Sequence, residues 1–510
     1  MRDRLSFPTT EYQQPFPQAG EAPPSTRAVA GSEPHAAGLV VAITTLAALV
    51  RVLHLGAKSL WLDEAASWMI VRQPWDAFVR QLLTAEGNMT LYYLLLRQWL
   101  RFGESEAWMR ALSVLPAVAT VPLVYALARR VWDVRAGLLA ALLLTLNACH
   151  VAYSQEARSY AWLAFATVVS TWYFLAGIDR PSFAGWTAYA WSTAAIVYFQ
   201  FLGGLVPLAQ WLSLAVLRRE QIPGKHLLYG LGVLAALVAP AAWYVITRDQ
   251  GQINWLPRPS LLELYHVLTF LASNGRKGLS NFLLLAYAAG LSLAIRAFCL
   301  ALRRCGRTLA NWHQALILCG FAGPIAISLV LSVWKLIFFK RFLFVCLPSL
   351  VMLVAAGIAQ VRSPRLLAVT VVYAAVCSAG TVCYWYGRPN EPWRDAAGYV
   401  FGAAHAGDVL VFHKPWSGHA AFDYYRGRMQ HLPGARSIVV QPVPNVLHPD
   451  PWSSPRVWLA LFHSSWGRSP DAGTLALRAS LQRAYGSMER RRFQNIEVDL
   501  FSRPREGGGR

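Results

Sequence analysis

Apolar segments of near-spanning length recur along the chain between about residue 37 and residue 384. A helix that crosses the ~30 Å hydrocarbon core of a bilayer needs ~20 mostly apolar residues. Only helices and closed barrels satisfy every backbone hydrogen bond in lipid, and the sequence lacks the ~10-residue alternating segments of a barrel. The pattern therefore predicts an α-helical polytopic membrane protein.

The apolar segments predict about eleven transmembrane helices. They lie at residues 37–55, 107–128, 136–153, 160–178, 184–199, 202–217, 227–246, 280–300, 314–334, 342–360 and 366–384. The uncharged run 184–217 is too long for one span and short for two, so we expect a tight hairpin that turns near Phe201–Gly204. The segment Thr90–Leu100 is short and carries Arg97, which favours an interfacial helix.

The chain carries a net charge of +21, although 55% of its residues are hydrophobic and only 14% are charged. Basic cytoplasmic loops, anionic lipid headgroups or a phosphorylated substrate would each explain the excess. With the N-terminus in the cytoplasm, the short cytoplasmic loops hold most of the basic residues between spans: Arg129, Arg130, Arg135, Arg180, Arg218, Arg219, Lys225, Arg303, Arg304, Arg307, Arg362 and Arg365. This orientation places residues 56–106, 153–160, 334–342 and everything after 385 on the extracytoplasmic side, which is the periplasm if the source is Gram-negative.

Composition divides the chain into three parts. Residues 1–36 are rich in Pro, Ser, Gln and Glu, and we expect a disordered cytoplasmic tail. Residues 37–385 form the transmembrane domain, with interfacial helices in its first outer loop, 56–106. Residues 386–510 read as a small extracytoplasmic α/β domain, with helices in 393–408 and 474–486 and strands at 408–412, 456–462 and 495–501.

Two adjacent carboxylates, Asp63 and Glu64, follow the first predicted span in the stretch KSLWLDEAASWMI. Acidic residues in the first turn of a helix commonly serve as caps that complement the helix dipole. The other interpretation is a general base, or a carboxylate that orients an acceptor, beside a reaction centre. Both interpretations remain open from the sequence.

The stretch YSQEARSY gathers polar side chains at one membrane interface. Arg158 shares this turn with Gln155, Glu156 and Tyr160. A single arginine at a helix end often only extends its charge to the headgroups. Polar clusters at membrane depth are functional candidates, so Arg158 is a candidate site residue and its three neighbours are candidates for a supporting role.

Lys335, Lys340 and Arg341 lie in one short outward loop and break the positive-inside pattern. A lipid phosphate bound on that side would account for them. The outer face thus gathers a carboxylate pair and several cations. Glycosyl transfer from a lipid-linked phosphate donor needs both, because a base activates the acceptor while cations stabilise the departing phosphate.

The sequence gives no reason to invoke a metal cofactor. The seven cysteines form no Cys-x-x-Cys pair and mostly lie in apolar runs, as small buried side chains do. No His, Asp or Glu spacing compels a site. We therefore predict no metal ligands and no cofactor, although the carboxylates do not exclude a divalent metal.

The chain resembles the GT-C membrane glycosyltransferases. It is most similar to a bacterial branch that contains lipid A aminoarabinose transferases, rhizobial lipopolysaccharide core transferases and protein O-mannosyltransferases. Five segments carry the resemblance in family order: LWLDEAASW, NMTLYYLLLRQWLRFGESEAWMRALSVLPA, YSQEARSYAW, FFKRFLFVCLPSL and EPWRDAAGYV. The family implies a polyprenyl-phosphate sugar donor and an inverting transfer to an extracytoplasmic lipid, glycan or protein. It makes Asp63 the catalytic carboxylate with Glu64 beside it, and Arg158, Arg341 and Lys340 contacts of the donor phosphate.

The sequence departs from the family pattern at three places. Phe342 follows Arg341 where many relatives have Tyr, Asn88-Met89 replaces a Pro-Pro pair, and Gln200 stands where relatives often carry His. Other classes compete with the glycosyltransferase, namely a transporter or flippase of polyprenyl-linked saccharide and an O-antigen polymerase or ligase that uses a diphosphate donor. A transporter would place ionisable residues near mid-bilayer and show paired repeats, which this sequence lacks. Nothing in the sequence indicates a nucleic-acid partner.

Overall fold

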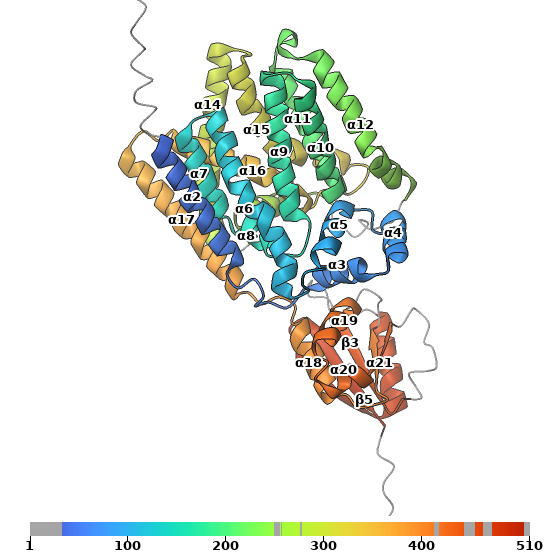
Figure 1. Cartoon of the computed structure of the whole chain (residues 1–510). Helices are drawn as coiled ribbons and strands as arrows, with labels where there is room; N and C mark the ends of the chain where they lie inside the picture. The colour runs from blue at the N-terminus through green and yellow to red at the C-terminus, as the bar shows by residue number, and fades with distance from the viewer. Residues whose placement is uncertain are drawn as a thin grey trace, which may run out of the picture.

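The computed structural model describes residues 33–248, 256, 258–275, 278–412, 418–442, 454–462 and 472–503. Nearly all of the expected tail, 1–36, lies outside these residues. A large helical bundle is followed by a smaller α/β part at the C-terminus (Figure 1). The helices of the bundle after the first outer loop are α6 Glu106–Val131, α7 Val134–Thr145, α8 Ala148–Ser154, α9 Tyr160–Asp179, α10 Phe183–Phe199, α11 Leu205–Ser213, α12 Gly224–Thr247, α13 Leu261–Ser273, α14 Leu279–Cys305, α15 Leu309–Leu331, α16 Leu347–Ala359 and α17 Pro364–Gly387, and α2 Glu33–Val52 precedes the loop.

Within the described residues, eight helices are long and apolar enough to cross a membrane, or up to nine if the bent pair α7 and α8 is one span. The prediction of about eleven spans also counted two shorter apolar helices, α10 and the segment Phe201–Val216. The predicted hairpin between them is present, because the short 3-10 helix η1, Phe201–Gly204, joins α10 to α11.

Three short helices of the first outer loop lie between the bundle and the C-terminal part: α3 Leu62–Arg72, α4 Trp75–Thr84 and α5 Thr90–Trp99 (Figure 1). The helix α5 has only ten residues, and its apolar face, including Tyr92 and Tyr93, is buried against the bundle. As predicted for Thr90–Leu100, it is not among the helices that could span the membrane.

A bend of 58° separates α7 from α8 and sets the direction of the chain that follows. The buried Arg51 of α2 donates hydrogen bonds to the carbonyls of Leu144 and Thr145, which have no partner inside α7. Asn147 caps α8 by accepting a hydrogen bond from the amide of His150. Because both ends of the break are satisfied, α8 can deliver residues 153–158 to the end of the bundle where α3 lies.

The C-terminal part contains a five-stranded sheet in the order β2-β1-β3-β5-β4. The strands are β1 Val409–Phe412, β2 Val439–Pro442, β3 Arg456–Phe462, β4 Ser487–Phe493 and β5 Ile496–Ser502, and the helices are α18 Trp393–Ala403, α19 His419–Arg428, α20 Pro433–Ser437 and α21 Ala472–Tyr485. The strands β2, β1 and β3 are parallel, whereas β5 and β4 are antiparallel. The predicted strands at 408–412, 456–462 and 495–501 and the helices in 393–408 and 474–486 are all present.

The C-terminal part contacts the first outer loop through polar side chains. The hydroxyl of Tyr425 accepts a hydrogen bond from the amide of Leu60 at 2.9 Å and donates to Glu106 Oε1 at 3.2 Å. Arg394 forms an ion pair with the same Glu106 at 2.8 Å. These contacts hold α18 and α19 of the C-terminal part against the segment that leads into α3.

Candidate active site

Asp63 lies in the first turn of α3, where its carboxylate meets two arginines from distant parts of the chain. Its Oδ2 lies 3.7 Å from Nη2 of Arg158 and 3.5 Å from Nη1 of Arg341. Arg158 also donates to the hydroxyl of Ser67, one turn further along α3. These separations exceed hydrogen-bond length, so the carboxylate is attracted to both cations without being locked to either. The Asp63 side chain is 37% exposed and can be reached by a ligand.

Glu64 has a different environment from its neighbour. Its carboxylate is fully buried and forms a bidentate ion pair with Arg110, with N–O distances of 2.8 and 2.7 Å. It also accepts hydrogen bonds from the amides of Ala157 and Trp61. Glu64 therefore supplies the side-chain hydrogen bond that caps α3, and Asp63 lies in the same first turn, where its charge also complements the helix dipole.

Glu64 also positions the loop that carries Arg158. The amide of Ala157 donates to Glu64 Oε1 at 2.8 Å, so the turn between α8 and α9 is tied directly to α3. Burial would lower the pKa of Arg158, but the Asp63 carboxylate and nearby tyrosines outweigh this effect and raise it. Within the described residues, Nε of Arg158 is buried without a hydrogen-bond partner.

Glu156 occupies the same loop and faces a cavity of about 660 Å³. Burial raises the pKa of Glu156 to about 7, although the Arg341 cation acts in the opposite direction. One of its oxygens, Oε2, is buried without a hydrogen-bond partner among the described residues. A ligand with a hydroxyl or amino group could supply that partner.

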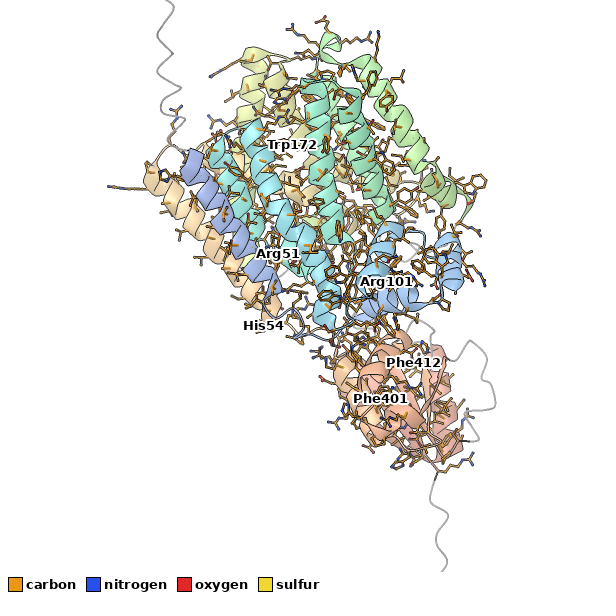
Figure 2. The ribbon with its side chains drawn as sticks, in the orientation of Figure 1. Arg51, His54, Arg101, Trp172, Phe401 and Phe412 are labelled. Carbon is orange, nitrogen blue, oxygen red and sulfur yellow. The ribbon has the colours of Figure 1, made fainter. Side chains whose placement is uncertain are left out.

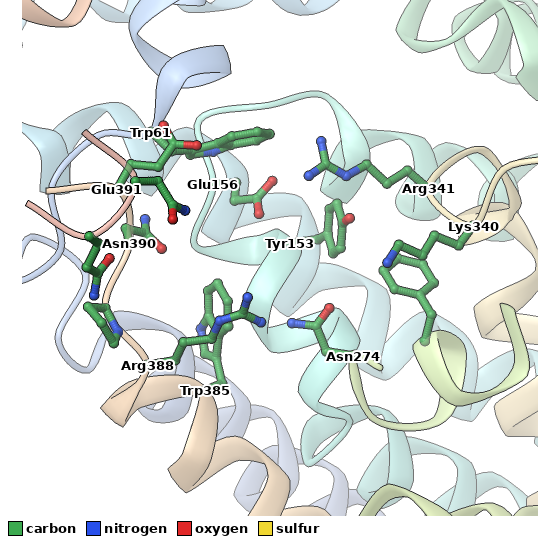
Figure 3. Close-up of a pocket in the computed structure, with 14 residues that line it drawn as sticks. Trp61, Tyr153, Glu156, Asn274, Lys340, Arg341, Trp385, Arg388, Asn390 and Glu391 are labelled. Atoms are coloured by element: carbon green, nitrogen blue, oxygen red, sulfur yellow. The ribbon is translucent and has the colours of Figure 1, made fainter. Parts of the chain in front are cut away.

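Three cations surround this cavity. Lys340 and Arg341 enter from one side and Arg388 from below, around Tyr153 and Glu156 (Figure 3). The Arg341 guanidinium lies over the Trp61 ring, 4.7 Å from its centroid, which fixes its plane. Burial and the neighbouring Arg341 lower the pKa of Lys340. The full lining is Trp61, Tyr153, Glu156, Phe270, Asn274, Lys340, Arg341, Trp385, Arg388, Pro389, Asn390, Glu391, Gln494 and Asn495.

Two of the lining residues come from the C-terminal part of the chain. Gln494 and Asn495 form the turn between β4 and β5, and Gln494 adopts a left-handed backbone conformation with φ of 48°. The cavity is thus closed partly by the bundle and partly by this turn. Asp63 meets the cavity through Arg341, which contacts its carboxylate and lines the cavity wall.

The structure brings together some of the predicted site residues and separates others. Asp63, Arg158, Arg341, Lys340 and Glu156 meet at one end of the bundle. Of these five, Glu156, Lys340 and Arg341 line the cavity, whereas Asp63 and Arg158 lie beside it. Glu64 is buried against Arg110, and three further predicted residues also lie away from the cavity. Lys335 is exposed near the end of α15, Tyr160 is buried edge-on against Tyr153, and Gln155 donates to the carbonyls of Arg51 and Leu53.

Sequence reasoning missed several acidic and basic groups of this site. Glu391 and Arg388 line the cavity, and burial raises the pKa of Glu391. Glu86, between α4 and α5, lies in the field of Arg158 and Asp63, and burial raises its pKa. The segment EPWRDAAGYV carries part of the family resemblance, and this signal could have identified Glu391. Glu86 stands in the stretch TAEGNMT, which has no distinguishing pattern.

The described part of the chain holds no group of three or more His, Cys, Asp or Glu side chains arranged to bind a metal ion. The carboxylates near Asp63 are instead interleaved with arginines. The charges present are therefore best suited to binding an anion beside a reactive carboxylate.

Comparison with known proteins shows the fold to which this site belongs. The family model described as dolichyl-phosphate-mannose-protein mannosyltransferase matches residues 89–244. No curated protein matches the chain. The structure is similar to that of ArnT from Cupriavidus metallidurans in the apo state, with 15% identity, a TM-score of 0.59 and coverage of 91% of this chain and 98% of that chain.

Two further solved structures share the architecture. ArnT from the same organism bound to undecaprenyl phosphate is 14% identical, with a TM-score of 0.56 and coverage of 91% of this chain and 98% of that one. The archaeal oligosaccharyltransferase AglB from Archaeoglobus fulgidus, in complex with an inhibitory peptide and a dolichol-phosphate, is 12% identical, with a TM-score of 0.50 and coverage of 83% and 69%. The chain is an integral membrane protein with the GT-C fold. The resemblance to GT-C proteins that the sequence indicates is confirmed for the fold.

Proposed function

We propose that the protein is a glycosyltransferase that moves a monosaccharide from a polyprenyl-phosphate donor to an acceptor in the cell envelope. The observation that carries the proposal is the Asp63 carboxylate, held within 3.7 Å of Arg158 and 3.5 Å of Arg341 at a cavity with three lining cations. The undecaprenyl phosphate and dolichol-phosphate bound to the similar structures support a lipid phosphate as the ligand of these cations.

The arrangement provides a base and a leaving-group site that are coupled electrostatically. A donor phosphate that binds Arg158 and Arg341 competes with Asp63 for the same two cations. Its arrival would free the carboxylate to accept a proton from the acceptor hydroxyl or amine. The attacking oxygen or nitrogen then forms the new glycosidic bond while the phosphate departs with the electron pair of the old one, and the cations stabilise its charge.

We propose that the acceptor attacks the anomeric carbon from the face opposite the departing phosphate, which inverts the configuration there. We assign Glu64 to a positioning role instead of a role in the reaction, because Arg110 and two backbone amides already occupy its oxygens. The acceptor is a lipid, a glycan or a protein, and the sugar is a hexose or a pentose.

We further propose the orientation and the division of the chain. The site lies at the opposite end of α6 from Arg129 and Arg130, and the positive-inside rule then places the site on the extracytoplasmic side of a bacterial inner membrane. Residues 37–385 would form the catalytic membrane domain and residues 386–510 an extracytoplasmic domain, with 1–36 in the cytoplasm.

The test is a donor assay with an isosteric variant. Wild type, Asp63→Asn and a control, Asp76→Asn, are purified in nanodiscs and incubated with a panel of undecaprenyl-phosphate monosaccharides and an envelope lipid extract. Asp76 is exposed in the first turn of α4, so the same substitution there leaves the site untouched. Mass spectrometry should show sugar leaving the carrier with wild type and Asp76→Asn but not with Asp63→Asn. Full turnover by a folded Asp63→Asn protein would falsify the assignment of the base, and turnover of a diphosphate-linked donor alone would favour a polymerase or ligase.

A further inference from the structure

A second hollow, of about 200 Å³, is lined by three arginines at the C-terminal ends of α3 and α5. Arg72 ends α3, Arg97 lies in the last turn of α5, and Arg101 follows shortly after it. Val71 and Leu100 complete the lining and are buried. Figure 2 labels Arg101 in the region of the short helices of the first outer loop.

The charges of this hollow are only partly compensated. Arg72 forms an ion pair with Glu104 at 2.9 Å. Arg97 donates to the carbonyls of Val71 and Gln73 at 2.5 and 2.7 Å. Arg101 is exposed, and no carboxylate of the described chain lies within ion-pair distance of it. Glu104 is therefore the carboxylate that pairs with an arginine of this hollow among the described residues, and it also lies 3.9 Å from Arg428.

Favourable charge at a helix C-terminus accounts for Arg72, in the last turn of α3, and for Arg97, but not for Arg101. Basic residues near a helix C-terminus interact favourably with its free carbonyls, and Arg97 does so at the end of α3. Arg101 lies beyond the end of α5 at Trp99, so this role does not account for it. Arg97 is also fixed over the Phe78 ring, 4.8 Å from its centroid, so one guanidinium of the hollow is held in place before any ligand arrives.

The hollow lies near the end of a helix that is long and apolar enough to span the membrane. The spanning helix α6 begins at Glu106, a few residues after Arg101, so this segment lies at the end of a membrane span. Phe102 is 79% exposed and Trp75 is 54% exposed next to the arginines. Exposed aromatic rings at the end of a span are typical of the membrane interface, where the phosphates of phospholipids also lie.

We propose that this hollow, formed by Arg72, Arg97 and Arg101, binds the phosphate of an anionic phospholipid in the leaflet on the Asp63 side of the membrane. The site is separate from the donor cavity, because Asp63 and Arg72 lie at opposite ends of α3, about 14 Å apart at 1.5 Å per residue. A lipid held here fixes the C-terminal end of the helix whose first turn carries Asp63. The proposal does not depend on the proposed function, since it concerns binding alone.

The experiment measures lipid binding to the full-length protein in detergent by native mass spectrometry. Phosphatidylglycerol, phosphatidylcholine and inorganic phosphate are titrated separately onto wild type, Arg101→Gln, Arg72→Gln/Arg101→Gln and a control, Arg80→Gln. Arg80 is an exposed arginine of the neighbouring α4 that does not line the hollow. Thermal melting of each variant confirms that it is folded.

We expect wild type and Arg80→Gln to bind phosphatidylglycerol in preference to phosphatidylcholine. Arg101→Gln should bind phosphatidylglycerol about tenfold more weakly, which corresponds to one lost charge-assisted hydrogen bond. The double variant should show no preference between the two lipids. Equal affinity of wild type and the folded double variant for phosphatidylglycerol would overturn the proposal. Binding of inorganic phosphate without any preference between the lipids would overturn the lipid as the source of the phosphate.

Discussion

Asp63 and Glu64 are adjacent in the sequence, but the structure gives them different surroundings. Successive residues of a helix point about 100° apart, so one carboxylate faces the two arginines near the cavity and the other faces the interior. Glu64 meets Arg110 and is fully buried, whereas Asp63 stays partly exposed. Two identical chemical groups can therefore carry different roles, one in holding the fold and one in meeting a ligand.

Glu64→Gln should destabilise the protein because it leaves the Arg110 charge buried without its partner. Removal of one member of a buried ion pair costs on the order of 3–5 kcal/mol. Asp63→Asn should cost less, because its carboxylate is partly exposed and lies 3.5 and 3.7 Å from the two arginines, beyond hydrogen-bond length. Thermal unfolding in detergent compares the two variants. A Glu64→Gln protein that melts together with wild type would contradict the positioning role.

Glu156 should make donor binding depend on pH. The pKa of Glu156 is raised to about 7, so its carboxyl is largely neutral below that pH and ionised above it. The ionised form competes with a donor phosphate for Arg341, whereas the neutral form does not. The KM for the donor is therefore expected to rise as the pH increases through about 7. In Glu156→Gln this rise should disappear, and an unchanged pH profile would show that another group titrates.

The raised pKa of Glu156 also makes the stability of the folded protein depend on pH. Between the ordinary glutamate pKa of about 4.3 and about 7, the folded protein binds a proton that the unfolded chain has released. The contribution of Glu156 to stability therefore falls as the pH rises across that window. Glu156→Gln should flatten this part of the stability profile.

At the scale of elements, the sequence best predicts helices and strands whose residues form continuous apolar runs. The strands β1, β3 and β5 are buried along most of their length and were found from their apolar residues. The strand β4, SMERRRF, was missed because it is an edge strand whose side chains are mostly exposed and charged. An edge strand with charged side chains avoids aggregation, but it lacks the alternation by which strands are recognised.

The turn between β4 and β5 should influence substrate binding. Gln494 and Asn495 line the cavity, although they belong to the C-terminal part of the chain. Replacing both with Ala removes amide groups that can hydrogen-bond a sugar or an acceptor, at about 1 kcal/mol for each lost bond. KM should increase several-fold with kcat nearly constant. Gln482→Ala, at an exposed position of α21, serves as the control. The prediction is wrong if the double variant and this control have the same KM.

At the scale of the whole molecule, the site exists only because separate segments meet. Asp63, Arg158 and Arg341 were each named from local patterns, and their meeting was expected from the topology and the family resemblance. The pairing of Glu64 with Arg110 was not predicted, because 46 residues separate them and no local pattern links the two. Arg388 and Glu391 were missed for the same reason, since their role depends on how the end of α17 lies against α3.

The contact between the C-terminal part and the first loop should control order in the segment that leads into α3. Tyr425→Phe removes the hydroxyl that forms hydrogen bonds with the buried Leu60 amide and with Glu106. Leaving the amide without a partner should destabilise the folded loop by about 1–3 kcal/mol. Hydrogen exchange in residues 56–62 should accelerate by about tenfold or more, and sugar transfer should slow because Asp63 follows directly. Tyr399→Phe is the matched control, since the Tyr399 hydroxyl contacts Glu489 within the C-terminal part itself. If hydrogen exchange in residues 56–62 is equally slow in both variants, the C-terminal part does not hold this loop. Its contribution to the site is then limited to the cavity-lining turn.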